Sequence, residues 1–355
     1  MITQKKEEQT TVAITLNPSK IMQVGLGFWS SKVLLTATKL ELFTQLAPLP
    51  LSAKQIKEKL KLHCSDRHVY DFLDALVSLG FLERKGLLEN ARYSNAEDTD
   101  LFLDKKKRTY MGGILEMANS RLYQFWNFLE DGLRTGEQQN EAKAGGNMEF
   151  FSDLYKDEHA LNEFVSAMSG IQAGNFMAFA TKFDFSNYKT LLDVGGADAS
   201  LSISVCLRQP HIKCINFDLA PVEAVAKKKI ASYNLANRIQ TISGDFLKNE
   251  LPHADLVTLG NILHGLDEHL KQQLIDKVYN SLPADGALVA IENIIDNDRR
   301  QNTIGLLMSL NMLIENGDGF DYTLDDFEKW AKKAGFKRVE QLPLTGPTSA
   351  AIAYK

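Results

Sequence analysis

Acidic side chains follow two neighbouring strand-like segments in the second half of the chain, and a glycine pair follows the segment before them. Gly195 and Gly196 close the run LLDVGG, Asp218 closes INFD, and Asp245 precedes Phe246 in SGDF. The carboxyl ends of parallel strands meet at one edge of a sheet, where a carboxylate can accept both hydroxyls of a ribose. Asp245 and Phe246 could then bind and flank an adenine. Together these residues predict a nucleoside pocket.

Each of these features also has a purely structural explanation. Glycines occur in many strand-to-helix turns, and Asp218 stands three residues before Pro221, where it could cap a helix. A dinucleotide fingerprint would need G-x-G-x-x-G, but counted from Gly195 its second and third glycine positions hold Ala197 and Ser200. The pattern therefore favours a nucleoside site that is not a pyrophosphate loop.

A histidine follows the next strand-like run, in the segment LGNILHGLDEH. His264 lies past the strand end and before a helix expected near Asp267, so it should face the same cleft. Glu292, after the fifth strand, and Asp321, before the last helix, could orient its ring. A lone histidine is more often a packing or surface residue, but this position favours a general base.

Extended and helical runs alternate beyond Tyr188, which is typical of a doubly wound parallel sheet of Rossmann-like α/β type. A last helix at 323–334 and two extended segments at 337–342 and 349–354 predict an antiparallel hairpin on the sheet edge. The expected strands are 190–195, 212–217, 239–242, 255–260 and 287–292, and the expected helices lie near 199–208, 220–234 and 267–281.

The N-terminal part has the order of a winged helix. We expect a helix at 31–46, a second helix from a Ser52/Gln55 capping box, a third near 66–79, and two short strands around a Lys85-Gly86 turn. The third helix carries three aspartates against one arginine, a net charge of −2 with its histidine neutral. Because that charge repels phosphates, DNA binding is not expected.

Length and composition favour a two-domain globular protein. The chain has 355 residues with 44% hydrophobic and 24% charged residues. We expect a flexible arm at 1–20, a winged-helix domain at 21–110, helices of a linker and acceptor site at 111–185, and a catalytic domain at 186–355.

The charge, the cysteines and the N-terminus exclude several partners and compartments. A net charge of −5 gives no drive toward nucleic acid or anionic lipid, and the basic runs at 105–108 and 227–229 are expected to be solvated. Three cysteines at unpatterned spacings argue against disulfides and a zinc site, so no metal is expected. The apolar runs are too short for a membrane span, and the N-terminus lacks a signal peptide's apolar core, so a cytoplasmic protein is expected.

The ordered series DVGG, NFDL, GDF, N-x-L-H and FEKWAKKAGF resembles the caffeic acid, acetylserotonin and bacterial natural-product O-methyltransferases. The resemblance extends over nearly the whole chain, including GFWSSKVLLTATKLELF and LDALVSLGFLER. It implies an S-adenosylmethionine-dependent enzyme of secondary metabolism, a homodimer joined through the winged-helix domains, and a histidine base acting on the hydroxyl, probably phenolic, of a small molecule.

The resemblance also carries roles to individual residues. His264 would be the base, with Glu292 and Asp321 as its positioning carboxylates. The cofactor would contact Gly195, Gly196, Asp218, Leu219, Asp245, Phe246 and Asn261, and the acceptor would contact Phe164, Met168, Met308 and Met312.

The chain departs from the family pattern at several of these positions. Ala197 and Ala199 replace two glycines of the D-x-G-G-G-x-G loop, and Gly265 follows the base where aspartate is common. Gly260 stands where a lysine or arginine is frequent, and Asp321 where glutamate is usual. These departures leave open methylation of carbon or nitrogen, loss of transfer, and, from another class, a winged-helix regulator that senses a ligand.

Overall fold

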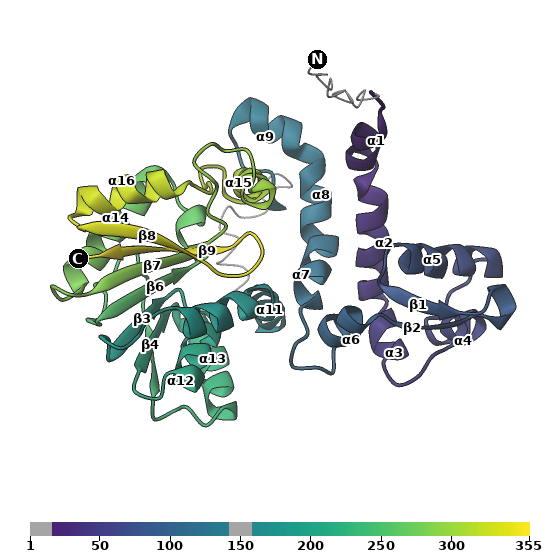
Figure 1. Cartoon of the computed structure of the whole chain (residues 1–355), viewed down its shortest axis with the longest axis horizontal. Coiled ribbons are helices and arrows are strands. Elements are labelled where there is room, and N and C mark those ends of the chain that lie inside the picture. The colour runs from purple at the N-terminus through teal and green to yellow at the C-terminus, as the bar shows by residue number, and fades with distance from the viewer. Residues whose placement is uncertain (1–15, 142–157) are drawn as a thin grey trace, which may run out of the picture. The chain divides into compact units, whose positions relative to one another are not determined.

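The computed structural model describes residues 16–141 and 158–355 of the chain (Figure 1). The chain divides into two compact units, Met1–Asp100 and Leu101–Lys355, and the division falls within helix α6 (Glu97–Leu103). Each unit has its own buried apolar residues. Leu42, Phe43 and Leu73 are buried in the first, and both faces of a sheet are buried in the second.

The first unit has the predicted winged-helix order of helices followed by a two-stranded antiparallel sheet, in purple to blue in Figure 1. Its regular elements are α1 (Ser19–Gly25), α2 (Gly27–Lys39), α3 (Leu42–Leu46), α4 (Ala53–Lys59), α5 (Asp66–Ser78), β1 (Leu82–Lys85), the 3₁₀ turn η1 (Leu88–Asn90) and β2 (Arg92–Asn95). Because α1 begins at Ser19, the last two residues of the expected flexible arm are helical.

The capping box predicted at the start of α4 is confirmed. The N–H of Gln55 donates to Oγ of Ser52 at 3.3 Å, and the N–H of Ser52 donates to Oε1 of Gln55 at 2.9 Å. The single helix predicted over 31–46 is wrong, because the backbone turns at Glu41 with a φ of 55°. The turn lets the short α3 bury Leu42 and Phe43 in the core, which a continuous helix would not allow.

The acidic helix α5 is largely paired within its own unit. Lys57 lies 2.7 Å from Asp66, Arg84 lies 2.7 Å from Asp74, and Arg67 contacts Asp71 at 3.1 Å. These contacts reduce the net negative field of the helix and also engage the basic residues that would contact a phosphate.

The second unit begins with helices and, over its described residues before 183, contains no strand, as predicted. After α6 come α7 (Gly112–Met117), the π-helical turn η2 (Ala118–Leu122), α8 (Tyr123–Phe125), the 3₁₀ turn η3 (Trp126–Phe128), α9 (Leu129–Thr135) and the long α11 (Glu158–Lys182). The sequence FFSDLYK, part of the segment expected to be helical, lies outside the described residues.

The rest of the second unit is a seven-stranded sheet with the order β5-β4-β3-β6-β7-β9-β8. The direction of strand succession reverses at β3, which pairs with β4 on one side and β6 on the other. The first five strands are parallel, and β9 and β8 form the predicted antiparallel hairpin at the edge. The strands are β3 (Thr190–Val194), β4 (Lys213–Asp218), β5 (Ile239–Ser243), β6 (Leu256–Gly260), β7 (Ala287–Glu292), β8 (Arg338–Pro343) and β9 (Ser349–Tyr354).

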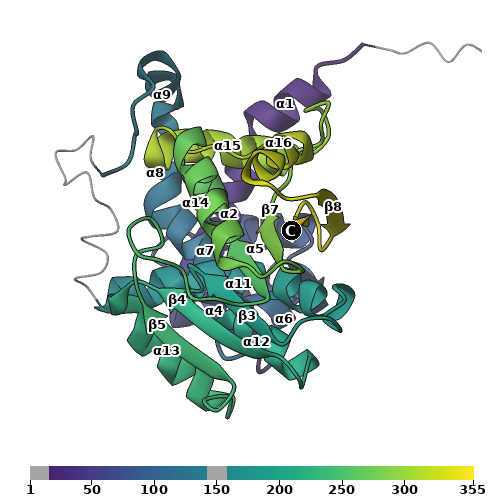
Figure 2. The ribbon, with the colours of Figure 1, turned by 90° about the vertical axis from the view of Figure 1, so that its left-hand side faces the viewer.

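Helices cover both faces of this sheet, as Figure 2 shows for α12 and α14. Alternate strand residues bury toward opposite sides: Leu191 packs with α11 and α12, and Leu192 packs with α14 and α16. The covering helices are α12 (Ser200–Arg208), α13 (Ala220–Ser232), α14 (Glu268–Ser281), α15 (Thr303–Asn316) and α16 (Leu324–Ala334), with a 3₁₀ turn, η5, at Leu263–Gly265. This arrangement confirms the Rossmann-like class and places the strand ends of β3 to β7 along one edge.

Candidate active site and cofactor loops

The loops after β3, β5 and β6 converge at Gly195. A side-chain carbon at Gly195 would lie 2.3 Å from Cδ1 of Ile262 and 4.0 Å from Cε1 of Phe246, and the backbone φ there is 68°. Gly195 and Phe246, predicted from separate motifs, are therefore neighbours at the strand-reversal edge, where ligands bind in open α/β sheets.

Gly196 is required for a different reason. A carbon added there would lie 2.1 Å from Oδ1 of Asn216 and 2.9 Å from Oδ2 of Asp193. The protein's own side chains thus fill the space beside Gly196, so its role is to let the loop pack on β3 and β4.

Asp218 joins the loops after β3 and β4. Its Oδ2 accepts a hydrogen bond from the N–H of Ala197 at 2.8 Å, and its Oδ1 accepts one from the N–H of Leu219 at 2.7 Å. Burial raises the pKa of Asp218 above its ordinary value, although both N–H donors lower it. The alternative of a helix cap at Asp218 is wrong, because the cap position of α13 is Leu219. Each carboxylate oxygen still has a lone pair for a further donor.

The two alanines of the glycine loop adopt left-handed backbone conformations. Ala197 has a φ of 45° and Ala199 a φ of 65°, so the departure from glycine did not change the loop's path but strains it. Between them, Asp198 accepts a 2.5 Å contact from Nζ of Lys229, which also lies 2.6 Å from Oγ of Ser200. Lys229 therefore differs from the solvated lysine expected in the run 227–229.

The loop after β5 is held by local contacts of Asp245. Its carboxylate accepts a 2.9 Å hydrogen bond from the N–H of Leu247 and lies 3.0 Å from Nζ of Lys248. Burial raises the pKa of Asp245, but these two donors lower it further, so it lies below its ordinary value. Asp245 is thus ionised and ready to accept another donor. After β6, Asn261 has a left-handed φ of 54°, which asparagine tolerates.

The predicted base and its two carboxylates form one cluster. Nδ1 of His264, in η5, lies 3.5 Å from Oδ2 of Asp321, and the His264 side chain is 13% exposed. Glu292 Oε1 accepts a 3.2 Å hydrogen bond from the backbone N–H of His264. Asp321 therefore faces the ring as predicted, whereas Glu292 holds the backbone. The expectation that Glu292 orients the ring directly is not what the contacts show.

Unsatisfied polar atoms are concentrated in this cluster. Of the ten buried side-chain polar atoms without a hydrogen-bond partner among the described residues, five belong to His264, Glu292, Asp321 and Tyr322. Burial lowers the pKa of His264, but Asp321 and Glu292 raise it by more, so it lies above its ordinary value. Burial raises the pKa of Glu292. Buried, unsatisfied and titratable groups together are typical of a catalytic site.

One charged residue of this cluster was missed in the sequence. Lys271 in α14 is fully buried, and burial lowers its pKa to about 8 against the opposing carboxylates Glu292 and Asp321. The sequence does carry a signal: Lys271 occupies the same helical stripe as Leu274, Ile275 and Val278. A lysine on the apolar face of an amphipathic helix is unusual enough to mark a functional position.

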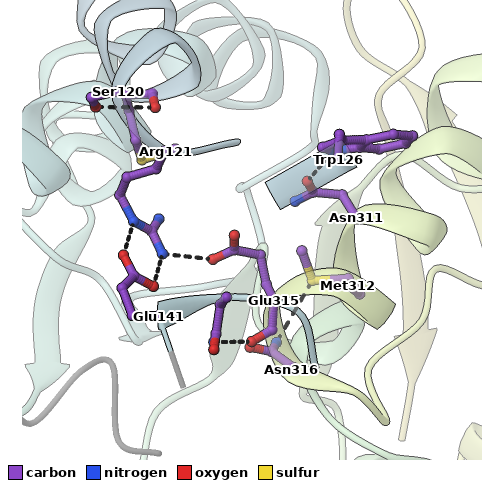
Figure 3. Close-up of polar contacts among 10 residues, drawn as sticks. Ser120, Arg121, Trp126, Glu141, Asn311, Met312, Glu315 and Asn316 are labelled. Atoms are coloured by element: carbon purple, nitrogen blue, oxygen red, sulfur yellow. Dashed lines mark hydrogen bonds and ion pairs between the residues drawn. The ribbon is translucent and has the colours of Figure 1, made fainter. Parts of the chain in front are cut away.

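Helix α15 brings Met312 to the loop of the base. Asn316 lies 3.8 Å from Sδ of Met312 and donates a 3.2 Å hydrogen bond to the carbonyl of Gly265, the residue after His264. Figure 3 shows Met312, Asn316 and Glu315 on one stretch of this helix. Met308 lies one turn earlier in the same helix and is half-buried.

The helices before α11 contact α15 through polar groups. In Figure 3, Nε1 of Trp126 donates to Oδ1 of Asn311 at 2.9 Å, and Arg121 lies between two carboxylates. Its guanidinium is 2.6 Å from Glu141 and 3.1 Å from Glu315. These contacts fix the segment around Trp126 against α15.

The two acceptor residues predicted in α11 lie apart from these contacts. Met168 is half-buried. Phe164 packs with Val222 of α13 and Ala197, which places it beside the glycine loop.

Two searches of the described residues gave no candidate. No helix within 16–141 and 158–355 is long and apolar enough to cross a membrane. Among the same residues, no three histidine, cysteine, aspartate or glutamate side chains are grouped as metal ligands.

Comparison with known proteins matches both units of the chain. A family model described as an O-methyltransferase dimerisation domain matches residues 22–105, and one described as an O-methyltransferase domain matches 126–337. The tetracenomycin polyketide synthesis 8-O-methyl transferase TcmO of Streptomyces glaucescens is 34% identical, over 95% of this chain and 97% of the relative.

Further relatives differ in the atom that their names give as methylated. The N,N-dimethyltransferase OxyT of Streptomyces rimosus is 28% identical, over 92% of this chain and 93% of its own length. The crystal structure of human N-acetylserotonin methyltransferase in complex with SAM superimposes with a TM-score of 0.87 at 27% identity, over 97% of this chain and 99% of that one.

Proposed function

Because the chain belongs to the S-adenosylmethionine-dependent O-methyltransferase family, we propose that it methylates a hydroxyl, phenolic in character, of a small molecule with His264 as general base. The observation that carries this proposal is the orientation of His264. Its Nδ1 faces the buried carboxylate of Asp321 at 3.5 Å, and its backbone is held by Glu292. The other ring nitrogen, Nε2, is then the atom left to take a proton.

The chain's part in the reaction is to hold the acceptor oxygen in line and to remove its proton. S-adenosylmethionine, when bound, supplies a methyl group on a positively charged sulfur. Nε2 of His264 accepts the hydroxyl proton as the oxygen attacks, and Asp321 stabilises the imidazolium through Nδ1–H. A phenol has a pKa near ~10 and histidine one near ~6.5, so proton removal must accompany attack. The raised pKa of His264 narrows that gap.

The cofactor residues form a site that fits a nucleoside. The convergence of Gly195, Phe246 and Ile262 leaves a ring face of Phe246 beside the glycine loop. Asp218 and Asp245 are ionised acceptors on neighbouring strand ends, suited to ribose hydroxyls and an exocyclic amine. We assign the cofactor to Gly195, Gly196, Asp218, Leu219, Asp245, Phe246 and Asn261.

We assign the acceptor to a surface formed by α11 and α15. Met312 is supported by its link through Asn316 to the loop of the base. Thioether side chains adapt to flat aromatic ligands, which suits a phenol. The assigned residues are Phe164, Met168, Met308 and Met312. Phe164 has the weakest support, because it packs beside the glycine loop.

Nitrogen methylation is the second candidate, because a relative named as an N,N-dimethyltransferase aligns over 92% of this chain. An amine that reacts as the free base needs less help from a histidine than a phenol does. Carbon methylation and a relative that has lost transfer are further outcomes of the same test, and a DNA-shift assay tests the ligand-sensing regulator.

We propose a cytoplasmic homodimer with a functional division at 1–20, 21–110, 111–185 and 186–355. Residues 22–105 match a dimerisation domain, and α1 and α2 expose apolar side chains. Ile21, Val24 and Trp29 are 75%, 76% and 60% exposed. The sulfur atoms of Cys206 and Cys214 lie 3.6 Å apart as free thiols, consistent with a reducing compartment.

The test is an acceptor screen. Purified protein is incubated with S-adenosylmethionine and separate sets of phenols, amines and carbon nucleophiles, and S-adenosylhomocysteine and methylated product are measured by mass spectrometry. Product from phenols that depends on His264 supports the proposal. Product only from amines would replace it with nitrogen methylation, and the absence of product from every class would favour a transfer-deficient protein.

A further inference from the structure

Helix α14 carries two lysines whose ammonium groups contact backbone carbonyls of the site loops. Lys271 donates to the carbonyl of Leu266, two residues after His264. Lys277, six residues further along the helix, donates to the carbonyls of Phe246, Leu247 and Asn249 at 2.8, 3.1 and 3.0 Å. A lysine ammonium has three donors, and Lys277 uses all three on the loop after β5.

Lys271 also contacts the loop that carries Asp321. Its Nζ lies 3.4 Å from the ring centroid of Phe320, the residue before Asp321, and 5.9 Å from that of Trp330. One buried cation therefore contacts the backbone of the base loop and the neighbour of the base's partner. The distance between His264 and Asp321 depends on both loops, so Lys271 is placed to fix it.

Lys277 acts on a different part of the same edge. The turn that it binds contains Phe246 and directly follows Asp245, and inside this turn Asn249 accepts the N–H of Asp245 at 2.8 Å. Three charge-assisted bonds to consecutive carbonyls of a short turn hold its backbone in one conformation. The turn in turn places the ring of Phe246 beside Gly195.

We propose that Lys271 and Lys277 are positioning residues of this enzyme: Lys271 fixes the base loop and sets its charge, and Lys277 fixes the cofactor loop after β5. This inference rests on the proposed roles of His264 and Phe246. It predicts that two lysines of one helix affect two separate properties, proton affinity of the base and affinity for the cofactor.

The charge of Lys271 acts on His264 within a defined set of groups. Asp321 faces the ring from the loop before α16, and Glu292 contacts the backbone from the end of β7. Asp267 and Glu268, at the start of α14, interact with Lys271 itself. From α15, Glu315 is paired with Arg121. Lys271 lowers the pKa of His264, whereas Asp321 and Glu292 raise it. Removal of this cation should therefore make His264 more basic.

The experiment compares Lys271→Met, Lys277→Met and the control Gln273→Met, an exposed position on the same helix. The pKa of His264 is followed by NMR of the imidazole signals, assigned with His264→Gln, and the Kd of S-adenosylhomocysteine is measured by calorimetry. Neither readout needs an acceptor, so a failed acceptor screen leaves the test intact.

Lys271→Met should raise the pKa of His264 by about 0.5–1 unit, as expected for loss of a nearby charge at an effective dielectric near ~20, and change Kd less than about twofold. Lys277→Met should raise Kd about tenfold and leave the pKa of His264 unchanged, and Lys277→Arg should restore part of the affinity. Gln273→Met should change neither. An unchanged His264 pKa in Lys271→Met, or an unchanged Kd in Lys277→Met, overturns that half of the proposal.

Wild-type protein supplies a second readout if Lys271→Met does not fold. The His264 signals should show a further inflection near pH 8, where Lys271 loses its proton. A single inflection over pH 5 to 10 would mean that the charge of Lys271 does not reach the base.

Discussion

The backbone N–H of Ala197 donates a 2.8 Å hydrogen bond to Oδ2 of Asp218, so the carboxylate proposed to bind the ribose also ties the glycine loop to the end of β4. Asp218 has two tasks that a neutral amide would perform less well. It accepts from Ala197 and from Leu219, and it keeps lone pairs for the nucleoside. Cofactor affinity and loop geometry are therefore coupled at this residue.

Replacement of this carboxylate should weaken cofactor binding. Asp218→Asn keeps the size of the side chain but removes its charge and turns one acceptor into a donor facing an N–H. We expect the Kd of S-adenosylmethionine, measured by calorimetry, to rise tenfold or more, which corresponds to about 1.4 kcal/mol. Lys228→Met, on an exposed face of α13, is the control and should bind normally. Equal affinity in Asp218→Asn and wild type would remove Asp218 from the site.

Glycine at position 199 should stabilise the protein. Ala199 has a left-handed φ of 65°, where alanine is strained and glycine is not, so Ala199→Gly should raise the free energy of unfolding by about 0.5–1 kcal/mol. The matched control is Ala224→Gly in the regular helix α13, which should cost about 1 kcal/mol. Both values come from urea unfolding curves. A loss of stability in Ala199→Gly would show that the loop conformation does not strain the alanine.

Removal of the proposed base should lower turnover and leave cofactor affinity nearly unchanged. His264→Ala is expected to reduce kcat by about 10²–10⁴-fold on a phenolic acceptor, and a higher pH should recover part of that loss because solvent then supplies the phenolate. Asp321→Asn should give a smaller deficit, because only the partner of Nδ1 is changed. If His264→Ala reduced kcat and cofactor affinity equally, the histidine would be structural.

The pH dependence of the wild-type rate should follow the base. His264 works in its neutral form, and its pKa lies above the ordinary value because Asp321 and Glu292 favour the charged form. The rate should therefore rise with pH through a midpoint above ~6.5. This midpoint should move to lower pH in Asp321→Asn, since that change removes a negative charge. An identical midpoint in both proteins would separate the observed titration from His264.

The buried Lys271 should make stability depend on alkaline pH. Its pKa is about 8 in the folded protein, below the ordinary value near ~10.4, so between these values the unfolded chain binds more protons. The free energy of unfolding of wild type should thus increase relative to Lys271→Met between pH 8 and 10, by a few kcal/mol at most, at about 1.4 kcal/mol per pKa unit. A constant difference between the two proteins over this range would contradict it.

The exposed apolar side chains of α1 and α2 should be buried between two copies of the chain. Light scattering at micromolar concentration should return about twice the 39.7 kDa of one chain. Val24→Asp with Trp29→Asp should shift the mass toward that of one chain, because these side chains are 76% and 60% exposed in a single copy. A wild-type mass near that of one chain would rule out the homodimer.

The sequence by itself determined the features that arise from local patterns. The capping box at Ser52 and the β8–β9 hairpin could be read from neighbouring residues, because caps and strand alternation depend on short spacing. The edge that holds Gly195, Asp218 and His264 also followed, because parallel strands end on the same side of a sheet.

Tertiary structure decided the contacts between residues far apart in the chain. Glu292 binds the backbone of His264 and not its ring, and Lys271, Lys229 and Lys277 each find carbonyls or carboxylates on a loop that lies elsewhere in the sequence or past a helix start. A long flexible side chain can reach many partners, and only the packing of α13 and α14 on the sheet selects one. The break at Glu41 has the same origin, since burial of Leu42 and Phe43 in the core outweighs the helical pattern of the sequence.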